Sequence, residues 1–215
     1  AKKKTVCSMF AGIGGIDLAF EQAGFKVVWA NEIDKYACRT YRLNFGDDYL
    51  VEADIQEIST DTIPHCDILV AGFPCQAFSS VGLKKGFEAP RGNLFFETAR
   101  VIAATKPECV FFENVANLVK HDGGNTFATI CSTLEELGYY YTYKVMNASD
   151  YGIPQQRNRI YMVAFLDKEK CDNFVFPKEK RLLHDAFYYF DKDRQHESYY
   201  DRRNRNVRRL QTYTF

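Results

Sequence analysis

The segment Gly72-Phe73-Pro74-Cys75-Gln76 carries the residue of this chain best suited to nucleophilic chemistry, the thiol of Cys75. It follows an apolar run, residues 67–71, that predicts a buried parallel strand. Pro74 lacks a backbone N–H and ends that strand. Cys75 then lies at the carboxyl end of a strand, where open α/β sheets bind ligands. Most cysteines are inert core residues, so the thiol alone is only a candidate nucleophile.

A carboxylate and two guanidinium groups are expected at the ends of later strands. Glu113 closes the apolar run 110–112, and Arg157 and Arg159 lead into the run 160–163. A carboxyl group at a strand end could carry a proton during a reaction. A structural salt bridge for Glu113 and surface ion pairs for the arginines remain open alternatives.

A glycine-rich turn, residues 10–15, joins the first expected strand to the first expected helix. Such a turn brings backbone N–H groups at a helix N-terminus close to a ligand. Glu32 lies 20 residues after Gly12, at the end of the second strand, where a carboxylate can bind ribose hydroxyls. Asp17 occupies the third glycine position of the dinucleotide fingerprint, so a nucleoside cofactor without a pyrophosphate is expected. A turn that serves only the fold is the alternative.

Alternating strand and helix patterns must position these groups. Strands are expected over residues 5–10, 25–30, 67–71, 108–113, 139–146 and 159–166, and helices over 16–23, 34–45, 94–105 and 126–137. This alternation predicts an α/β fold with a parallel, doubly wound sheet. The pattern weakens after Pro177, which divides the chain into a domain over 1–177 and a charged, tyrosine-rich segment over 178–215.

The composition excludes several classes of protein. The 215 residues are 46% hydrophobic, with 28 basic and 28 acidic side chains, as in a globular protein. Zero net charge neither requires nor excludes a nucleic-acid partner, because nucleic acid binds to a local basic patch that the total charge does not reveal. No apolar run approaches the roughly 18 residues of a membrane span and no secretory h-region is seen, so we expect a cytoplasmic protein without a membrane partner. The seven cysteines lack metal-ligand spacing, which favours reduced thiols and no bound metal.

Taken together, these motifs resemble the C5-specific DNA cytosine methyltransferases of bacterial restriction-modification systems. The resemblance covers about residues 5–177, through the segments 10–15, 31–32, 72–76, 113–115 and 155–159 in the order of the family. It implies a Rossmann-like methyltransferase fold, mostly parallel with an antiparallel late strand, and S-adenosylmethionine as methyl donor.

The resemblance also implies roles for single residues. Cys75 would add to carbon 6 of a cytosine flipped out of double-stranded DNA, Glu113 would hold ring nitrogen 3, Arg159 would hold the 2-oxo group and Arg157 would support the site. The expected cofactor contacts are Phe10, Ala11, Gly12, Gly14, Gly15, Glu32, Ile33, Asp54, Ile55, Phe73, Pro74 and Leu94. The expected DNA contacts are Gln76, Ser79, Lys84, Lys85 and Arg91, in and before a loop over 77–93 that would close on the base. A solvated loop tip is the alternative for Lys84 and Lys85.

The target-recognition region and last motifs of the family are not found in residues 178–215. We therefore expect either a truncated enzyme or a subunit whose missing part is supplied by a second polypeptide, with residues 178–215 as the start of that region or as a partner-binding arm. A non-catalytic module that binds cofactor or DNA and a tRNA cytosine-C5 methyltransferase remain alternatives. A nicotinamide oxidoreductase is disfavoured by Asp17 and by the lack of hydride-transfer residues.

Overall fold

The computed structural model describes residues 3–74 and 94–181. Its strands are β1 (Thr5–Met9), β2 (Lys26–Glu32), β3 (Leu50–Glu52), β4 (Ile68–Ala71), β5 (Cys109–Val115), β6 (Tyr140–Asn147) and β7 (Asn158–Phe165). Its α-helices are α1 (Gly15–Gln22), α2 (Lys35–Phe45), α3 (Leu94–Thr105), α4 (Asn125–Glu136) and α5 (Lys168–Asn173). Short 3-10 turns are η1 (Ile55–Glu57), η2 (Thr60–Thr62), η4 (Ala116–Gly124) and η5 (Ala148–Asp150).

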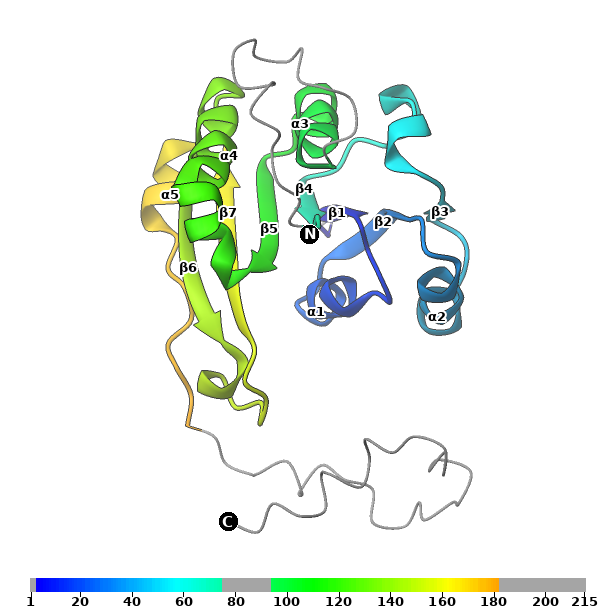
Figure 1. The fold of residues 1–215 in the computed structure, drawn as a ribbon. Helices are drawn as coiled ribbons and strands as arrows, with labels where there is room; N and C mark the ends of the chain where they lie inside the picture. The colour runs from blue at the N-terminus through cyan, green and yellow to red at the C-terminus, as the bar shows by residue number, and fades with distance from the viewer. Residues whose placement is uncertain (1–2, 75–93, 182–215) are drawn as a thin grey trace, which may run out of the picture.

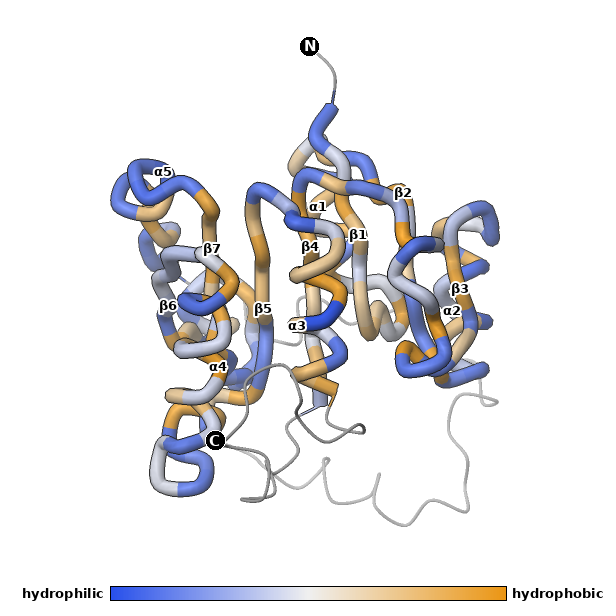
Figure 2. Tube along the Cα trace, turned by 90° about the horizontal axis from the view of Figure 1, so that it is seen from above, coloured by the Kyte–Doolittle hydropathy of each residue, from blue (hydrophilic) through white to orange (hydrophobic). Residues whose placement is uncertain are grey.

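The strands form one sheet in the order β3-β2-β1-β4-β5-β7-β6, which can be followed from right to left in Figure 2. Strands β3, β2, β1, β4 and β5 pair in parallel. Strand β7 is antiparallel to both of its neighbours, β5 and β6. The predicted Rossmann-like, mostly parallel sheet with an antiparallel late strand is therefore confirmed.

Helices cover both faces of the sheet. Figure 1 shows α1 and α2 on one side of β1–β3 and α3 on the other side. Alternate residues of the strands serve the two faces: Val6 and Val70 pack with side chains of α1, whereas Cys7 and Leu69 belong to the larger cluster with α3 and α4. This near-continuous apolar character is typical of a parallel sheet that is covered on both sides.

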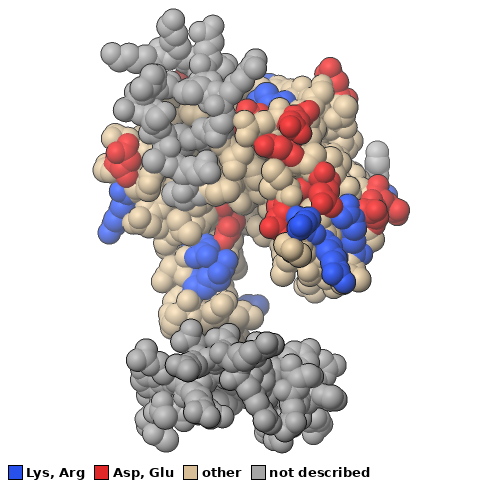
Figure 3. Space-filling view, turned by 45° about the vertical axis from the view of Figure 1, so that its right-hand side comes forward, with Lys and Arg blue, Asp and Glu red and all other residues tan. Residues whose placement is uncertain are grey.

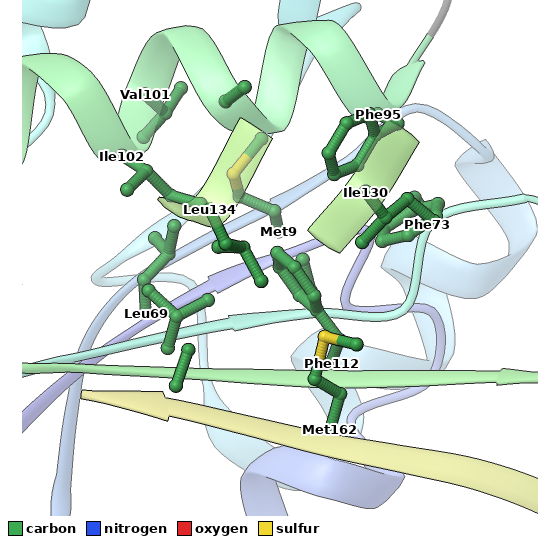
Figure 4. Close-up of a cluster of buried hydrophobic side chains, with 14 of the residues drawn as sticks. Met9, Leu69, Phe73, Phe95, Val101, Ile102, Phe112, Ile130, Leu134 and Met162 are labelled. Atoms are coloured by element: carbon green, nitrogen blue, oxygen red, sulfur yellow. The ribbon is translucent and has the colours of Figure 1, made fainter. Parts of the chain in front are cut away.

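The main hydrophobic core lies between the sheet and α3 with α4. Figure 4 shows Phe112 and Met162 of the sheet directed towards Phe95, Ile130 and Leu134. These side chains are 4% exposed or less. Because burial of one such side chain stabilises a fold by about 1.5–3 kcal/mol, this core fixes the sheet that carries the site.

Local signals in the sequence explain the ends of the helices. The Asp34 side chain accepts hydrogen bonds from the backbone N–H groups of Tyr36 and Ala37 and caps α2. Gly24, with φ of 93°, follows α1 in the left-handed conformation that favours glycine. Helix α5 was not expected from the sequence, although Asp167 caps it in the same way.

The described surface carries charges of both signs, and the last described residues are fixed to the connection between β6 and β7. On the face drawn in Figure 3, basic and acidic side chains lie beside one another, and a notch separates the column of β6 and β7 from the lobe of α1 and α2. Within the described ranges, no helix has the length and apolar character needed to cross a membrane. The backbone N–H of Lys180 donates to the Asp150 carbonyl at 2.7 Å. The domain boundary at residue 177 stays a prediction.

Candidate active site and cofactor crevice

The predicted site residues gather at one edge of the sheet because of its topology. Strands β1, β2, β4 and β5 run parallel, so their carboxyl ends meet at this edge. Strand β7 runs the other way and begins there, with Arg159 paired to Val115 at the end of β5. Residues separated by more than 140 positions in the chain, from Gly12 to Arg159, therefore lie along one edge of the sheet, which we call the cofactor crevice.

The glycine turn after β1 has the backbone conformation that its sequence predicts. Gly12 and Gly14 have φ values of 58° and 90°, in the region that favours glycine. A Cβ atom at Gly14 would overlap the ring of Phe45, which lies on α2 behind the turn. The Ala11 N–H donates to the Asn31 carbonyl at 2.9 Å, which fixes the turn to β2. Gly15 begins α1, so the first N–H groups of this helix, which have no partner within the helix, lie at this edge of the sheet.

Glu32, at the end of β2, links the turn to the next segment of chain. Its Oε2 accepts from the Gly12 N–H at 2.8 Å, and its Oε1 accepts from the N–H groups of Ile33 and Asp34 at 2.8 and 2.9 Å. A carboxylate has about four lone-pair sites, so these three bonds leave one site, on Oε2, for a hydroxyl donor. The arrangement suits a ribose that donates one hydroxyl group to this carboxylate.

The other expected cofactor contacts differ in how they are presented. The Ile33 side chain is 62% exposed beside Glu32, as an adenine contact requires. The Asp54 carboxylate accepts from the Gln56 N–H at 2.9 Å and begins η1. The Ile55 side chain is only 2% exposed and belongs to the main core, so a ligand contact from this residue is limited to its backbone. Phe73 is 4% exposed and packs on Phe95 and Phe112, whereas Phe10, Pro74 and Leu94 are half-buried or exposed.

Glu113 and Arg159 form an ion pair across neighbouring strands. The Arg159 Nε lies 2.9 Å from Glu113 Oε1, and each side chain is 20% exposed. The Glu113 Oε2 lies 3.6 Å from the position of a Cβ built on Gly72, so the carboxylate is next to the backbone that leads to Pro74. Tyr161 pairs with Glu113 in the register, and burial, followed by the charge of Glu113, raises the pKa of its hydroxyl group. A carboxylate and a guanidinium held side by side can bind the amide-like edge of a heterocyclic base.

Asn114 has a positional role that the sequence did not reveal. Its side-chain amide donates to the Phe73 carbonyl at 2.8 Å, and its Oδ1 accepts from the Val115 N–H at 2.8 Å. The residue is only 4% exposed. It therefore fixes Phe73, which lies two residues after the end of β4 and two residues before Cys75, to β5. In the sequence it belongs to the segment 113–115 that carries the family resemblance, but no role was predicted for it.

The remaining predicted residues divide into two groups. The Arg157 side chain is exposed, and its backbone N–H donates to Asn147 Oδ1 at 2.8 Å. Cys75, Gln76, Ser79, Lys84, Lys85 and Arg91 lie outside the described residues. Six other cysteines are free, and the described parts of the chain hold no group of three or more His, Cys, Asp or Glu residues that could bind a metal.

Comparison with known proteins connects this arrangement to a family. The family model of the C-5 cytosine-specific DNA methylases matches residues 4–213. The chain belongs to the C-5 cytosine-specific DNA methylase family. Among curated members, the type II methyltransferase M.Bsp6I of Bacillus sp. (strain RFL6) is 49% identical over 200 residues, which cover 86% of this chain and 63% of that protein. M.HhaI of Haemophilus parahaemolyticus is 52% identical over 174 residues, 81% of this chain and 53% of its own. This methylase chain thus spans less than two thirds of the length of these relatives.

Solved structures agree with the methylase fold. A putative DNA modification methyltransferase from an E. coli prophage has a TM-score of 0.66 and 24% identity, and the match covers 84% of this chain and 52% of that one. The DNMT2 mutant of Spodoptera frugiperda has a TM-score of 0.65 and 23% identity, over 85% and 56% of the two chains. At such identity these likenesses establish the fold alone.

Proposed function

We propose that the protein transfers a methyl group from S-adenosylmethionine to carbon 5 of cytosine in double-stranded DNA. The observation that carries the proposal is the Glu113–Arg159 pair, which borders the backbone of Gly72 just before Cys75. A pyrimidine could place its ring nitrogen 3 at the carboxyl group and its 2-oxo group at the guanidinium, and the family of the chain makes cytosine the proposed base. The crevice with the glycine turn and Glu32 would hold the cofactor beside it.

The residues of the chain would share the chemistry as follows. The Cys75 thiolate would add to carbon 6, which makes carbon 5 nucleophilic, and would leave after the proton at carbon 5 is lost. Glu113 would hold or protonate ring nitrogen 3 while Arg159, supported by Arg157, binds the 2-oxo group. The cofactor, when bound, supplies a methyl group on an electrophilic sulfonium.

The cofactor proposal is supported by the form of the crevice. The turn at Gly12 and Gly14 allows a close approach of ligand to backbone, the Glu32 carboxylate is placed for a ribose hydroxyl, and Ile33 offers an exposed apolar side chain for adenine. Ala11, Gly15 and Asp54 would add contacts around it, and the backbone of Ile55, Phe73, Pro74 and Leu94 would complete the set.

The DNA contacts are proposed for the loop after the catalytic cysteine. Gln76 and Ser79 would contact the flipped base and its neighbours, and Lys84, Lys85 and Arg91 would bind phosphates. Phosphate contacts position the protein on DNA but carry no sequence information. The recognition sequence would then depend on other parts of the whole protein.

A covalent trap tests the proposal. A duplex with 5-fluorocytosine in place of the target cytosine, incubated with the protein and S-adenosylmethionine, is expected to give an adduct that survives denaturing electrophoresis, because fluorine at carbon 5 cannot leave as a proton. Cys75→Ser should abolish the adduct, while Cys131→Ser, which removes a half-buried thiol on α4, should retain it. An adduct that persists in Cys75→Ser would disprove the assignment.

The same assay separates the alternatives. Adduct formation on 5-fluorocytosine-containing tRNA and not on DNA would indicate a tRNA methyltransferase. No transfer in the presence of a complementary polypeptide that carries the rest of the family sequence would indicate a non-catalytic module. Transfer only with that polypeptide would indicate a two-chain enzyme.

A further inference from the structure

Asp17 is a buried carboxylate at an unusual place in the fold. Its residue is only 1% exposed. The Ser8 hydroxyl donates to Oδ1 at 2.6 Å, and the Tyr41 hydroxyl donates to Oδ2 at 2.6 Å. Both donors are themselves buried, at 1% and 0% exposure. The carboxylate thus connects β1, α1 and α2 behind the glycine turn.

The carboxylate lies in the first turn of α1. Gly14 is the N-cap and Gly15 the first residue of this helix, so Asp17 is its third residue. The N-terminus of a helix carries a partial positive charge of about half an elementary charge. A carboxylate within this turn offsets that charge from inside the protein.

Among the described residues, no basic side chain forms an ion pair with Asp17. Its hydrogen-bond donors are neutral hydroxyl groups, and the ion pairs formed within residues 3–74 and 94–181 do not include it. The other titratable groups that influence it are Glu21 on α1 and the hydroxyl groups of Tyr41 and Tyr49. Burial raises the pKa of Asp17, while the bonds from Ser8 and Tyr41 oppose this rise.

The position has a consequence for ligand choice. Glycine turns that lead into a helix commonly bind phosphate, because the helix N-terminus favours an anion. Here the third glycine of the dinucleotide fingerprint is replaced by a fixed anion, so an additional phosphate would meet negative charge. S-adenosylmethionine carries a positively charged sulfonium, and not a phosphate, at the 5′ carbon of its ribose, so no anion would lie at that position.

We propose that Asp17 is a specificity determinant of the cofactor crevice, whose buried carboxylate makes the glycine turn reject 5′-phosphorylated nucleosides. The inference rests on the proposed nucleoside cofactor. It goes beyond that function because it assigns the rejection of nucleotides to one residue that touches neither base nor ribose. Asp17 acts through the electrostatics of the turn, so it is not a catalytic residue.

The test compares two ligands that differ only by the phosphate. Adenosine and adenosine 5′-monophosphate compete against S-adenosylhomocysteine in isothermal titration calorimetry at about pH 8, on the alkaline side because burial raises the pKa of Asp17. In the wild-type protein, the dissociation constant of the monophosphate should be about tenfold that of adenosine. Asp17→Asn preserves the shape of the side chain and removes its charge, so it should reduce this ratio of dissociation constants about tenfold. Glu21→Gln removes an exposed carboxylate one turn further along α1 and should leave the ratio within about twofold.

The ratio of the two dissociation constants shows whether Asp17 selects between the ligands or only supports the fold of the turn. A damaged turn would weaken both ligands equally, so an unchanged ratio in a folded Asp17→Asn protein would overturn the proposal. Asp17→Ser provides a second, smaller replacement if the amide prevents folding. A wild-type protein that binds the monophosphate as tightly as adenosine would also refute it, without any variant. Failure of the wild-type protein to bind S-adenosylhomocysteine would instead overturn the proposed cofactor, and this inference with it.

Discussion

Replacement of Asn114 by leucine should slow the covalent step more than it weakens cofactor binding, because Asn114 fixes the segment just before Cys75. Leucine has nearly the same shape as asparagine but cannot donate to the Phe73 carbonyl, which lies 2.8 Å from the amide nitrogen. A buried carbonyl left without a donor costs about 1–3 kcal/mol. The Val115 N–H also loses its acceptor, but Val115 is 39% exposed and water can replace that bond. Asn114→Leu should therefore lower the free energy of unfolding by about 1–3 kcal/mol.

The same substitution should slow the covalent step. Phe73 precedes Cys75 by two residues, and a displacement of about 1 Å at a reacting group can cost about 100-fold in rate. We expect the rate of adduct formation on 5-fluorocytosine DNA to fall about 10- to 100-fold. The affinity for S-adenosylhomocysteine, measured by calorimetry, should fall less than the trapping rate, because the glycine turn and Glu32 are on other strands and only the contacts from the backbone of Phe73 and Pro74 lie beside Asn114.

Urea unfolding and the trapping rate measure the two effects. Asn44→Leu is the matched control, since Asn44 is exposed on α2 and bonds only within its own helix in the described contacts. It should change stability by no more than about 0.5 kcal/mol and leave the trapping rate unchanged. A folded Asn114→Leu protein that traps DNA at the wild-type rate would refute the positional role of Asn114.

Two further predictions concern the stability of the sheet and of the glycine turn that it carries. Gly14→Ala should destabilise the protein by about 2–5 kcal/mol, from the positive φ and from overlap with Phe45, whereas Gly12→Ala, with free space around its Cβ, should cost only about 1–2 kcal/mol. Equal losses in urea unfolding would contradict this packing argument. The Thr5 backbone N–H, with its hydroxyl group and Lys4, lowers the pKa of Asp67 to about 2. Because this folded-state pKa is below the unfolded value of about 3.9, Asp67 stabilises the protein above about pH 4 and loses that contribution as the pH falls towards 2. The stability gap between wild type and Asp67→Asn, about 1–2 kcal/mol at neutral pH, should close over that range, whereas exposed Asp48→Asn should show no such gap.

Much of the fold could be predicted because local signals agreed with the final structure. Helix α3 spans the predicted residues 94–105, where apolar side chains recur at helical spacing and bury one face. Strand β4 stops before Gly72 and Pro74 as expected. Helix α5 was missed because its six residues are mostly charged and bury only Cys171. Its N-cap, Asp167, was the one signal that could have indicated it.

The site was less predictable where contacts cross long distances in the chain. The spacing from Gly12 to Glu32 indicated a cofactor crevice, and the pair of Glu113 and Arg159 was expected to converge. The bond from Asn114 to Phe73 joins residues 41 positions apart and leaves no periodic pattern. Similarly, Asp17 was recognised as a break in a glycine motif, but its partner Tyr41 on α2 was not recognisable from the sequence.

The reversed direction of β7 has a consequence for how such proteins can vary. Arg159 enters the sheet as the second residue of β7 and is held there by pairing with β5 on one side and β6 on the other. The connection from Asn147 to Asn158 therefore does not determine where the guanidinium lies. Insertions in the part of that connection that precedes residues 155–159 should be tolerated by the reaction, because they leave Arg157 and Arg159 in place, so the length of this part is open to evolutionary drift and to engineering.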